Sequence, residues 1–223
     1  LPGLAAGCVA TVGAFDGIHL GHQAILGRLR DEAALLGVPS LVISFRPHPL
    51  EVVNPAAAPG LLTPDEEQLE QLAAIGVDYL VLLPFTAELA SLTAEEFVER
   101  LLLGRFHMRS LLVGHDHGLG RGREGSVDRL KQLGSRLGFP VEVVPAVIVD
   151  GAPVSSSAIR RAIAYGSLDE SHRLLGRRYS FAGRVVPGQS RGRLLGYPTL
   201  NLALPSPRKL LPPPGVYAVL VET

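Results

Sequence analysis

The chain has 223 residues, of which 47% are hydrophobic and 19% charged, and its formal net charge is zero. This length suits one large domain or two small ones, and the composition is too apolar for a disordered chain and too neutral for a general nucleic-acid binder. The apolar runs are shorter than the ~18 residues of a membrane span, the N-terminus lacks a secretory pattern, and the single cysteine, Cys8, excludes a disulfide framework and a cysteine-built zinc site. We therefore expect a cytoplasmic globular protein with no membrane or nucleic-acid partner.

Up to about Val149, short β-branched runs alternate with longer segments of helical period. The predicted strands are 8–12, 41–45, 79–83, 111–113 and 141–144. The predicted helices between them are 22–36, 64–75, 94–103 and 127–137. Capping boxes are expected at Thr63 with Glu66 and at Thr93 with Glu96, and C-terminal glycine caps at Gly37, Gly76, Gly104 and Gly138. The alternation predicts an α/β fold whose parallel sheet binds ligands beyond the carboxyl ends of its strands.

Two further helices are expected at 155–166 and 168–175, and after Tyr179 the pattern changes to short strands with Gly and Pro. We place a boundary near residues 172–178, giving domains 1–175 and 176–223. The second unit has about 45 residues, which is marginal for an independent fold, where ~60 is already hard to stabilise. The chain ends in a predicted strand at 219–223.

Charge is distributed unevenly along the chain. Residues 1–171 contain 13 Lys and Arg against 20 Asp and Glu, whereas the residues from His172 onward contain eight against one. This asymmetry suggests two units of different character, one of which handles phosphate. The alternative, which the residues alone leave equally open, is truncation, in which the missing acidic residues lie outside this chain.

The first predicted strand leads into a glycine- and histidine-rich turn. Gly13 and Gly17 let backbone approach a ligand, and Gly21 lets the chain turn into the next helix. His19 and His22 are one turn apart at a helix N-terminus, where free N–H groups and the dipole favour anions. The pattern therefore predicts phosphate contact; the alternatives are a two-histidine metal site, for which further ligands are missing, and a pair that only caps and packs.

A second candidate phosphate site is the run Ser155, Ser156 and Ser157 followed by Arg160. Hydroxyls at a helix start can cap N–H groups or donate to phosphate oxygens, and a guanidinium can bind phosphate through two N–H groups. Serines at a helix start usually only cap the helix. The prediction of a phosphate site here therefore depends on the glycine- and histidine-rich turn described above.

Two other patterns are set aside. Residues 120–125 spell G-x-G-x-x-G, but they do not directly follow a strand, so we interpret them as a mobile loop. No Walker A sequence is present, because the only lysines, Lys131 and Lys209, lack its context.

Several motifs together resemble a known family. GAFDGIHLGH at 13–22, FRPHP at 45–49, VGHD at 113–116 and SSSAIR at 155–160 occur in the order of the adenylyltransferase module of bacterial bifunctional riboflavin kinase/FAD synthetases. GRLLGYPTLNL at 192–202 resembles the start of the kinase module of the same proteins. The resemblance covers nearly the whole chain and implies a Rossmann-like nucleotidylyltransferase domain followed by the start of a β-barrel.

That resemblance implies transfer of AMP from ATP to FMN, giving FAD and pyrophosphate by direct in-line attack, a reaction that depends mostly on positioning and charge stabilisation. His19 and His22 would stabilise charge on the transferring and leaving phosphates, and Arg160 would hold the β- and γ-phosphates. Magnesium would bridge ATP phosphates near Asp116. The implied ATP-binding residues are Gly13, Phe15, Asp16, Gly17, Gly21, Asp116, Ser155, Ser156 and Ser157.

Pro47, His48 and Pro49 match the loop that borders the flavin in this family, although a rigid Pro-x-Pro turn would explain them equally. The family usually has aromatic residues where this chain has His117 and Leu119, so this loop lacks two rings that could pack near the flavin or against the sheet.

In the kinase-like segment, Thr199 and Asn201 match residues that contact ATP and magnesium, and Gly183, Val185 and Gly192 match a glycine-rich cradle. The family's general-base carboxylate lies far downstream of this element. We therefore expect no riboflavin kinase activity from these 223 residues and an incompletely folded second unit.

The implied partners are the small molecules ATP, FMN and riboflavin, with self-association left open. Two rival hypotheses remain at this point. One is another nucleotidylyltransferase of the same superfamily, against which the Pro-Thr-Leu-Asn element argues; the other is a non-catalytic flavin- or nucleotide-binding module. A purely structural protein is disfavoured by two anion-binding helix starts on one sheet.

Overall fold

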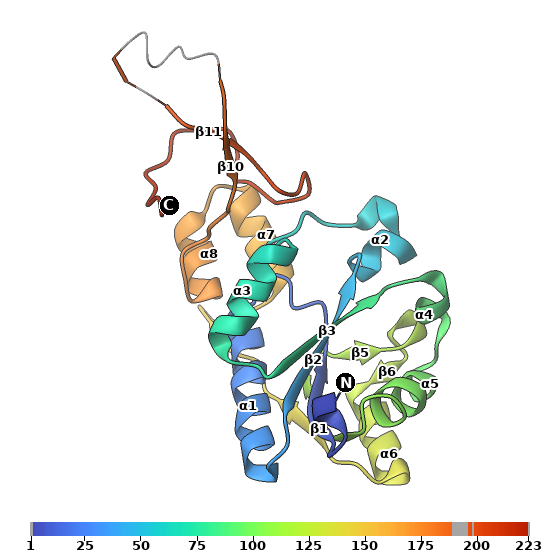
Figure 1. The fold of residues 1–223 in the computed structure, drawn as a ribbon. Coiled ribbons are helices and arrows are strands. Elements are labelled where there is room, and N and C mark those ends of the chain that lie inside the picture. The colour runs from blue at the N-terminus through green and yellow to red at the C-terminus, as the bar shows by residue number, and fades with distance from the viewer. Residues whose placement is uncertain (1, 189–195, 198, 223) are drawn as a thin grey trace.

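The computed structural model describes residues 2–188, 196–197 and 199–222 (Figure 1). A five-stranded parallel sheet, with strand order β3-β2-β1-β4-β7, forms its centre. The strands are β1 (Cys8–Val12), β2 (Ser40–Arg46), β3 (Tyr79–Pro84), β4 (Met108–Gly114) and β7 (Val141–Val144). The predicted α/β class and all five predicted strands are confirmed, since each observed strand contains its predicted range.

The central strands consist largely of apolar residues because the sheet is covered on both faces. All five residues of β1 are buried. Successive side chains point to opposite faces, so Ala10 packs in one apolar cluster with Ile43, whereas Val9 packs in the other with Val42.

Helices cover each face of the sheet, as Figure 1 shows. On one side, α1 (Leu20–Leu36) and α3 (Asp65–Ile75) bury Leu26 and Leu72 against the strands. On the other side, α5 (Ala94–Phe97), the π-helical turn η3 (Val98–Leu103) and α6 (Val127–Leu137) bury Phe97, Leu102 and Leu130. All four predicted helices are therefore present, with 94–103 changing from α to π geometry partway.

Three of the four predicted glycine caps adopt the expected left-handed conformation, at Gly37, Gly76 and Gly138. Gly104 also follows a helix, but its φ of −73° is right-handed, because the preceding turn is π-helical and the N–H of Gly104 reaches back to the carbonyl of Glu99. No left-handed residue is needed there.

The capping box at Thr93 and Glu96 is confirmed, because each side chain binds the other's backbone N–H. The one expected at Thr63 and Glu66 is wrong. The N-cap of α3 is Pro64, which makes no side-chain cap bond, because the Thr63 hydroxyl is engaged in tertiary contacts with Asp16 and Gly17.

Several short elements were not predicted, since each is too short to show a period. They are η1 (Pro2–Leu4), α2 (Pro49–Val53), η2 (Pro55–Ala57), α4 (Ala87–Ser91), β5 (Gly118–Leu119), η4 (Arg121–Arg123), β6 (Gly125–Ser126), β8 (Ile148–Val149) and β9 (Ala152–Pro153). The segment 120–125 is therefore not an irregular loop. It forms the turn and part of the β5–β6 hairpin, and a Cβ on Gly120 or Gly125 would collide with Ala94 at the start of α5.

After α7 (Ser156–Ala164) and α8 (Leu168–Leu175) the chain forms a small antiparallel pair, β10 (Arg184–Val186) and β11 (Asn201–Ala203), which projects from the α/β body (Figure 1). The strand predicted at 219–223 is not formed over its described residues 219–222. Val219 and Leu220 are 67% and 79% exposed, and no strand of the described part of the chain lies beside them to complete a ladder. Among the described residues, no helix is both long and apolar enough to cross a bilayer.

Candidate active site

The turn after β1 has an unusual backbone. Phe15, Gly17 and Ile18 have φ values of +47°, +89° and +38°. A positive φ is strained for a β-branched residue such as Ile18, and such strain persists only where the surroundings impose it. One contact comes from a distant element, because Gln68 in α3 donates to the carbonyl of Phe15 at 3.1 Å. The other is local, because Gln23 in the adjoining helix α1 donates to the carbonyl of Ile18 at 2.9 Å.

His19 and His22 lie at the first turn of α1, as the sequence predicts. His19 is the N-cap, and its Nδ1 accepts the N–H of His22 at 3.3 Å. The two rings stack with centroids 3.7 Å apart and planes inclined by 17°, and Phe15 packs against His22 with centroids 5.1 Å apart. A Cβ at Gly21 would lie 3.2 Å from the His19 ring, so the small residue leaves room for that ring.

Burial keeps both imidazoles neutral. The pKa of His19 is lowered to about 4, mainly by burial and also by the positive charges of Arg160 and Arg177. Burial and the neighbouring His19 lower the pKa of His22 well below its ordinary value of 6.5. Because Nδ1 of neutral His19 accepts a hydrogen bond, Nε2 carries the proton and is a donor for an incoming oxygen. Nδ1 of His22 is buried and has no partner within the described residues.

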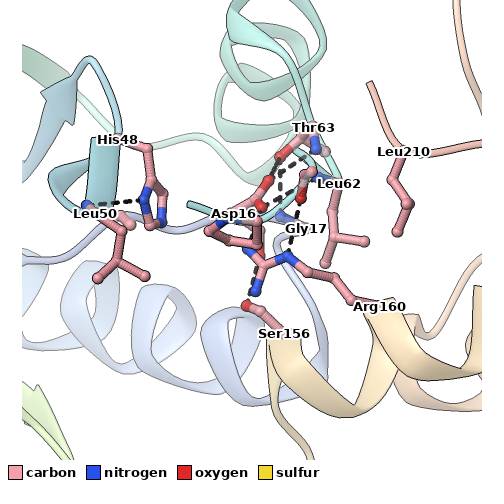
Figure 2. Close-up of polar contacts among 12 residues, drawn as sticks. Asp16, Gly17, His48, Leu50, Leu62, Thr63, Ser156, Arg160 and Leu210 are labelled. Atoms are coloured by element: carbon pink, nitrogen blue, oxygen red, sulfur yellow. Dashed lines mark hydrogen bonds and ion pairs between the residues drawn. The ribbon is translucent and has the colours of Figure 1, made fainter. Parts of the chain in front are cut away.

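Asp16 and Arg160 form a buried ion pair beside this turn (Figure 2). Nη2 of Arg160 lies 2.5 Å from Oδ2 of Asp16, and the side chains are 16% and 5% exposed. Asp16 also accepts from the backbone N–H groups of Leu62 and Thr63, at 3.1 and 2.8 Å, and from the Thr63 hydroxyl at 3.1 Å. Nε of Arg160 donates to the carbonyl of Gly60 at 3.0 Å. Among the described contacts, Nη1 of Arg160 makes no hydrogen bond and so is available to an anion.

The serine run starts α7, and its three hydroxyls differ in what they contact. Ser155 is the N-cap and accepts from the N–H of Ala158 at 3.2 Å, so it does what an ordinary capping serine does. Ser156 donates to the carbonyl of Asp16 at 2.8 Å, which ties the start of α7 to the β1 turn (Figure 2). Ser157 is exposed. The two predicted phosphate sites therefore meet in space although they are about 140 residues apart in the chain.

The loop after β2 carries Pro47, His48 and Pro49. The Arg46–Pro47 peptide is cis, and His48 caps α2 by accepting the N–H of Leu50 at 3.3 Å while Glu51 accepts the N–H of His48 at 3.0 Å. Burial lowers the pKa of His48. These capping contacts are enough to explain the backbone conformation of the loop. They agree with the alternative that the loop is only a rigid turn.

Asp116 follows β4 with 78% of its side chain exposed. Its neighbour His117 is neutral, because burial lowers its pKa to about 4. Leu119 is 5% exposed and packs in the core with Phe97. The replacement at Leu119 therefore fills core space, while Nε2 of His117 is buried without a partner among the described residues.

The kinase-like residues lie apart from this cluster. Val185 and Asn201 are on β10 and β11, Gly183 and Thr199 are exposed beside them, and Gly192 lies outside the described residues. No described contact joins any of the four described residues to His19 or Arg160. The two-histidine metal alternative gains no support, since no group of three or more His, Cys, Asp or Glu in the described chain could hold a metal ion.

Sequence reasoning missed two side chains that bind the backbone of Gly17. Thr63 accepts the N–H of Gly17 at 2.8 Å, and Arg177 donates to the carbonyl of Gly17 at 2.9 Å. Thr63 has the local signature of a helix cap, which hides its tertiary contact. Arg177 is 160 residues away from its partner and has no local signature.

Comparison with known proteins adds to this geometry. Residues 2–158 match the family model for FAD synthetase, and residues 175–223 match that for riboflavin kinase. A Pseudomonas fluorescens protein named bifunctional riboflavin kinase/FMN adenylyltransferase is 45% identical over 97% of this chain and 68% of its own length. The Escherichia coli K12 protein of the same name is 40% identical over 96% of this chain and 68% of its own length.

A solved structure also resembles this one. The crystal structure titled macrolide-efflux protein from Streptococcus pneumoniae has a TM-score of 0.80 and 32% identity, with 92% of this chain and 66% of that one covered. The chain thus spans about two thirds of the length of these relatives.

Proposed function

This chain belongs to the family of bifunctional riboflavin kinases/FMN adenylyltransferases. From that premise we propose which residues bind the substrates and which stabilise the reacting phosphates. The chain is a nucleotidyltransferase that transfers AMP from ATP to FMN, giving FAD and pyrophosphate. We assign this reaction to residues 1–175 and place residues 176–223 at the start of the riboflavin kinase domain.

The reaction forms one P–O bond and breaks another. A phosphate oxygen of FMN attacks the α-phosphorus of ATP, and the bond to the oxygen that bridges the α- and β-phosphorus breaks as pyrophosphate leaves. Negative charge builds up on the α-phosphate and on the leaving pyrophosphate, so well-placed N–H donors accelerate the step. The observation that carries our assignment is the convergence of two helix N-termini, those of α1 and α7, on the Asp16–Arg160 pair.

In this assignment His19 and His22 contact the reacting phosphates. Neutral His19 donates a hydrogen bond from Nε2. Nδ1 of His22 is buried and has no hydrogen-bond partner among the described residues, and we infer that a bound ligand supplies one. A neutral imidazole can also gain a proton when an anion binds beside it, because the anion's charge favours the imidazolium form. Both histidines thus supply more stabilisation as charge develops.

Arg160 holds the β- and γ-phosphates through Nη1, while its Nε and Nη2 stay fixed by Gly60 and Asp16. A guanidinium fixed on two sides is already oriented, so less conformational entropy is lost when phosphate binds. Ser156 and the start of α7 add N–H donors nearby. Gly13, Phe15, Gly17, Gly21, Ser155 and Ser157 complete the proposed ATP site.

The side chains of this site are suited to magnesium that enters bound to the phosphates of ATP. The donor set is one exposed carboxylate, Asp116, because Asp16 is taken up by Arg160 and by backbone N–H groups. Magnesium prefers few protein carboxylates together with substrate phosphates and water, which agrees with this set. When bound, the ion neutralises phosphate charge; Asp116 would hold it, and Thr199 and Asn201 would serve the kinase reaction in the same way.

The flavin is assigned to the loop of Pro47, His48 and Pro49, whose backbone is held by the capping contacts of His48 with Leu50 and Glu51. Phosphorylation of riboflavin is assigned to the longer family proteins. In this structure Thr199 and Asn201 are exposed on the small β10–β11 unit.

The test is to incubate the purified chain with FMN, ATP and magnesium and to separate the products by chromatography. We expect FAD and pyrophosphate in equal amounts. If no FAD forms at saturating concentrations of FMN and ATP, the assignment is overturned. If the chain binds ATP but forms no FAD, the result favours a non-catalytic binding module. A parallel incubation with riboflavin and ATP tests the kinase assignment, for which we expect no FMN.

A further inference from the structure

Residues 60–63 lie between the Asp16–Arg160 pair and the C-terminal part of the chain. On the first side, the carbonyl of Gly60 accepts from Arg160 at 3.0 Å, and the N–H groups of Leu62 and Thr63 donate to Asp16 at 3.1 and 2.8 Å. This short segment therefore fixes both members of the ion pair through its backbone.

The other side of the same segment pairs with residues 208–210. The N–H of Leu61 donates to the carbonyl of Arg208, and the N–H of Leu210 donates to the carbonyl of Leu61, both at 2.8 Å. Figure 2 places Leu210 beside Leu62, across from Asp16. Residues that match the riboflavin kinase family thus complete the backbone pairing of a segment in the adenylyltransferase unit.

Lys209 anchors this contact with a buried ammonium. Its side chain is 1% exposed, and Nζ donates to the carbonyls of Leu62 and Ser180 at 2.7 Å each and to Oε2 of Glu67 at 2.5 Å. The three N–H donors of the ammonium are therefore all used. Nζ also lies 4.5 Å from the centre of the Tyr179 ring.

The partners of Lys209 come from both units of the chain. Glu67 is in α3 and 8% of its side chain is exposed, and its other oxygen accepts the N–H of Ala182 at 3.2 Å. A buried ion pair loses hydration on both charges, so apolar residues often stabilise a fold as well as the pair does. What an apolar pair would not supply is a directed hydrogen bond to the Leu62 carbonyl.

We propose that Lys209 is a positioning residue for adenylyl transfer: from the kinase-like segment, its ammonium holds the carbonyl of the Leu62–Thr63 peptide. The N–H of that peptide, on Thr63, in turn orients Asp16, and Asp16 orients the phosphate-binding Arg160. This rests on the proposed function of the site. It makes the geometry of the ATP site depend on a residue outside the α/β unit, so the two units are coupled through residues 60–63.

The test uses the double variant Lys209→Met/Glu67→Met, which removes both charges together and so leaves no unpaired buried ion. Its kcat and KM for ATP are compared with those of the wild type and of Lys131→Met, which replaces the other lysine, on α6. We expect kcat/KM for ATP to fall about tenfold in the double variant at temperatures where it is fully folded, because small displacements of positioning groups slow phosphoryl transfer strongly. The Lys131→Met control stays at the wild-type value.

A folded double variant whose kcat/KM is within twofold of the wild type overturns the proposal. If the double variant does not fold, Tyr179→Phe takes its place: it keeps the ring but removes the hydroxyl that donates to the carbonyls of Leu62 and Leu210, at 3.4 and 2.7 Å, and so loosens the same Leu62 carbonyl that Lys209 holds. We expect kcat/KM for ATP to fall by less in Tyr179→Phe, about threefold. If both kcat and KM for ATP are unchanged in this variant, the proposal is overturned.

Amide hydrogen exchange separates this proposal from the proposed function. We expect the amides of Leu62, Thr63 and Gly17 to exchange faster in the double variant than in Lys131→Met, whether or not FAD is formed. A wild-type chain that makes no FAD defeats the proposed function, whereas unchanged exchange at these amides defeats the positioning by Lys209.

Discussion

The imidazole rings of His19 and His22 are stacked face to face, with centroids 3.7 Å apart, and the N–H of His22 is bound by Nδ1 of His19. Each ring therefore fixes the other, and both are oriented before a substrate arrives. A hydrogen-bond donor that is already oriented needs no reorganisation during the reaction, and for that reason it lowers the activation barrier.

From this relationship we expect His19→Ala to lower kcat for FAD formation by about 100-fold, while KM for ATP changes little, since the lost hydrogen bond matters most when charge has developed. Steady-state assays of FAD formation check this. The matched control is His172→Ala, in α8, which should retain wild-type turnover. Equal losses in kcat for both variants would contradict a specific contribution from His19.

The same histidines make stability depend on pH. The folded pKa of His19, about 4, lies below its ordinary value of 6.5, so its contribution to stability is present above pH 6.5 and is lost as the pH falls toward 4. His22 acts in the same direction. We expect the free energy of unfolding to fall by about 2 kcal/mol between pH 7 and pH 5 from His19 alone. Urea titrations at both pH values measure it, and His19→Gln should show a smaller fall; an equally large one would count against this cause.

Asp16 should be much more important for stability than an exposed carboxylate in a similar pair. Asp16→Asn leaves Arg160 without its buried partner and is expected to lower the free energy of unfolding by about 3 kcal/mol. Asp150→Asn removes the exposed pair with Arg173, whose side chains are 64% and 54% exposed, and should lower it by less than ~1 kcal/mol. Urea unfolding compares the two variants, and similar losses would show that burial does not set the difference.

Cys8 offers a reporter of unfolding. Its side chain is fully buried in β1, its Sγ lies 3.3 Å from the carbonyl of Phe106, and burial raises the pKa of the thiol to about 11. Since the thiolate is the reactive form, we expect alkylation at pH 8 to be at least ~100-fold slower in the native chain than in urea. Mass spectrometry of the single cysteine gives both rates. Fast labelling of the native chain would show that β1 opens readily.

The fold could be predicted from the sequence because its signals are local and repeated. The strands of the sheet are short, largely apolar runs, and the glycines at Gly37, Gly76 and Gly138 mark helix ends by a backbone requirement that few other residues meet. By contrast, the predicted strand at 219–223 had the right composition, but a strand also needs a neighbour, and none lies beside its described residues. Composition cannot supply a partner.

The candidate site was predicted in part for the same reason. The histidines and the serine run lie at helix starts, and the carboxyl edge of a parallel sheet gathers such starts, so their meeting followed from topology. The contacts that hold the site could not be predicted. His48 caps α2 although histidine is not a usual N-cap residue, and Arg177 reaches Gly17 across 160 residues of sequence.

Two threonines with the same sequence signature should behave differently. Thr93 caps α5, whereas the Thr63 hydroxyl accepts the buried N–H of Gly17 and donates to Asp16. We expect Thr93→Val to lower the free energy of unfolding by about 1 kcal/mol, the usual value of a lost cap, with no change in FAD formation. Thr63→Val keeps the shape but leaves the Gly17 N–H unpaired, at a cost of about 2 kcal/mol. Because Gly17 belongs to the strained turn beside His19, Thr63→Val should also lower kcat/KM, by about tenfold. Urea unfolding and FAD assays on both variants make the comparison, and a loss of kcat/KM shared by Thr93→Val would mean that helix stability, rather than the tertiary contact of Thr63, controls the site.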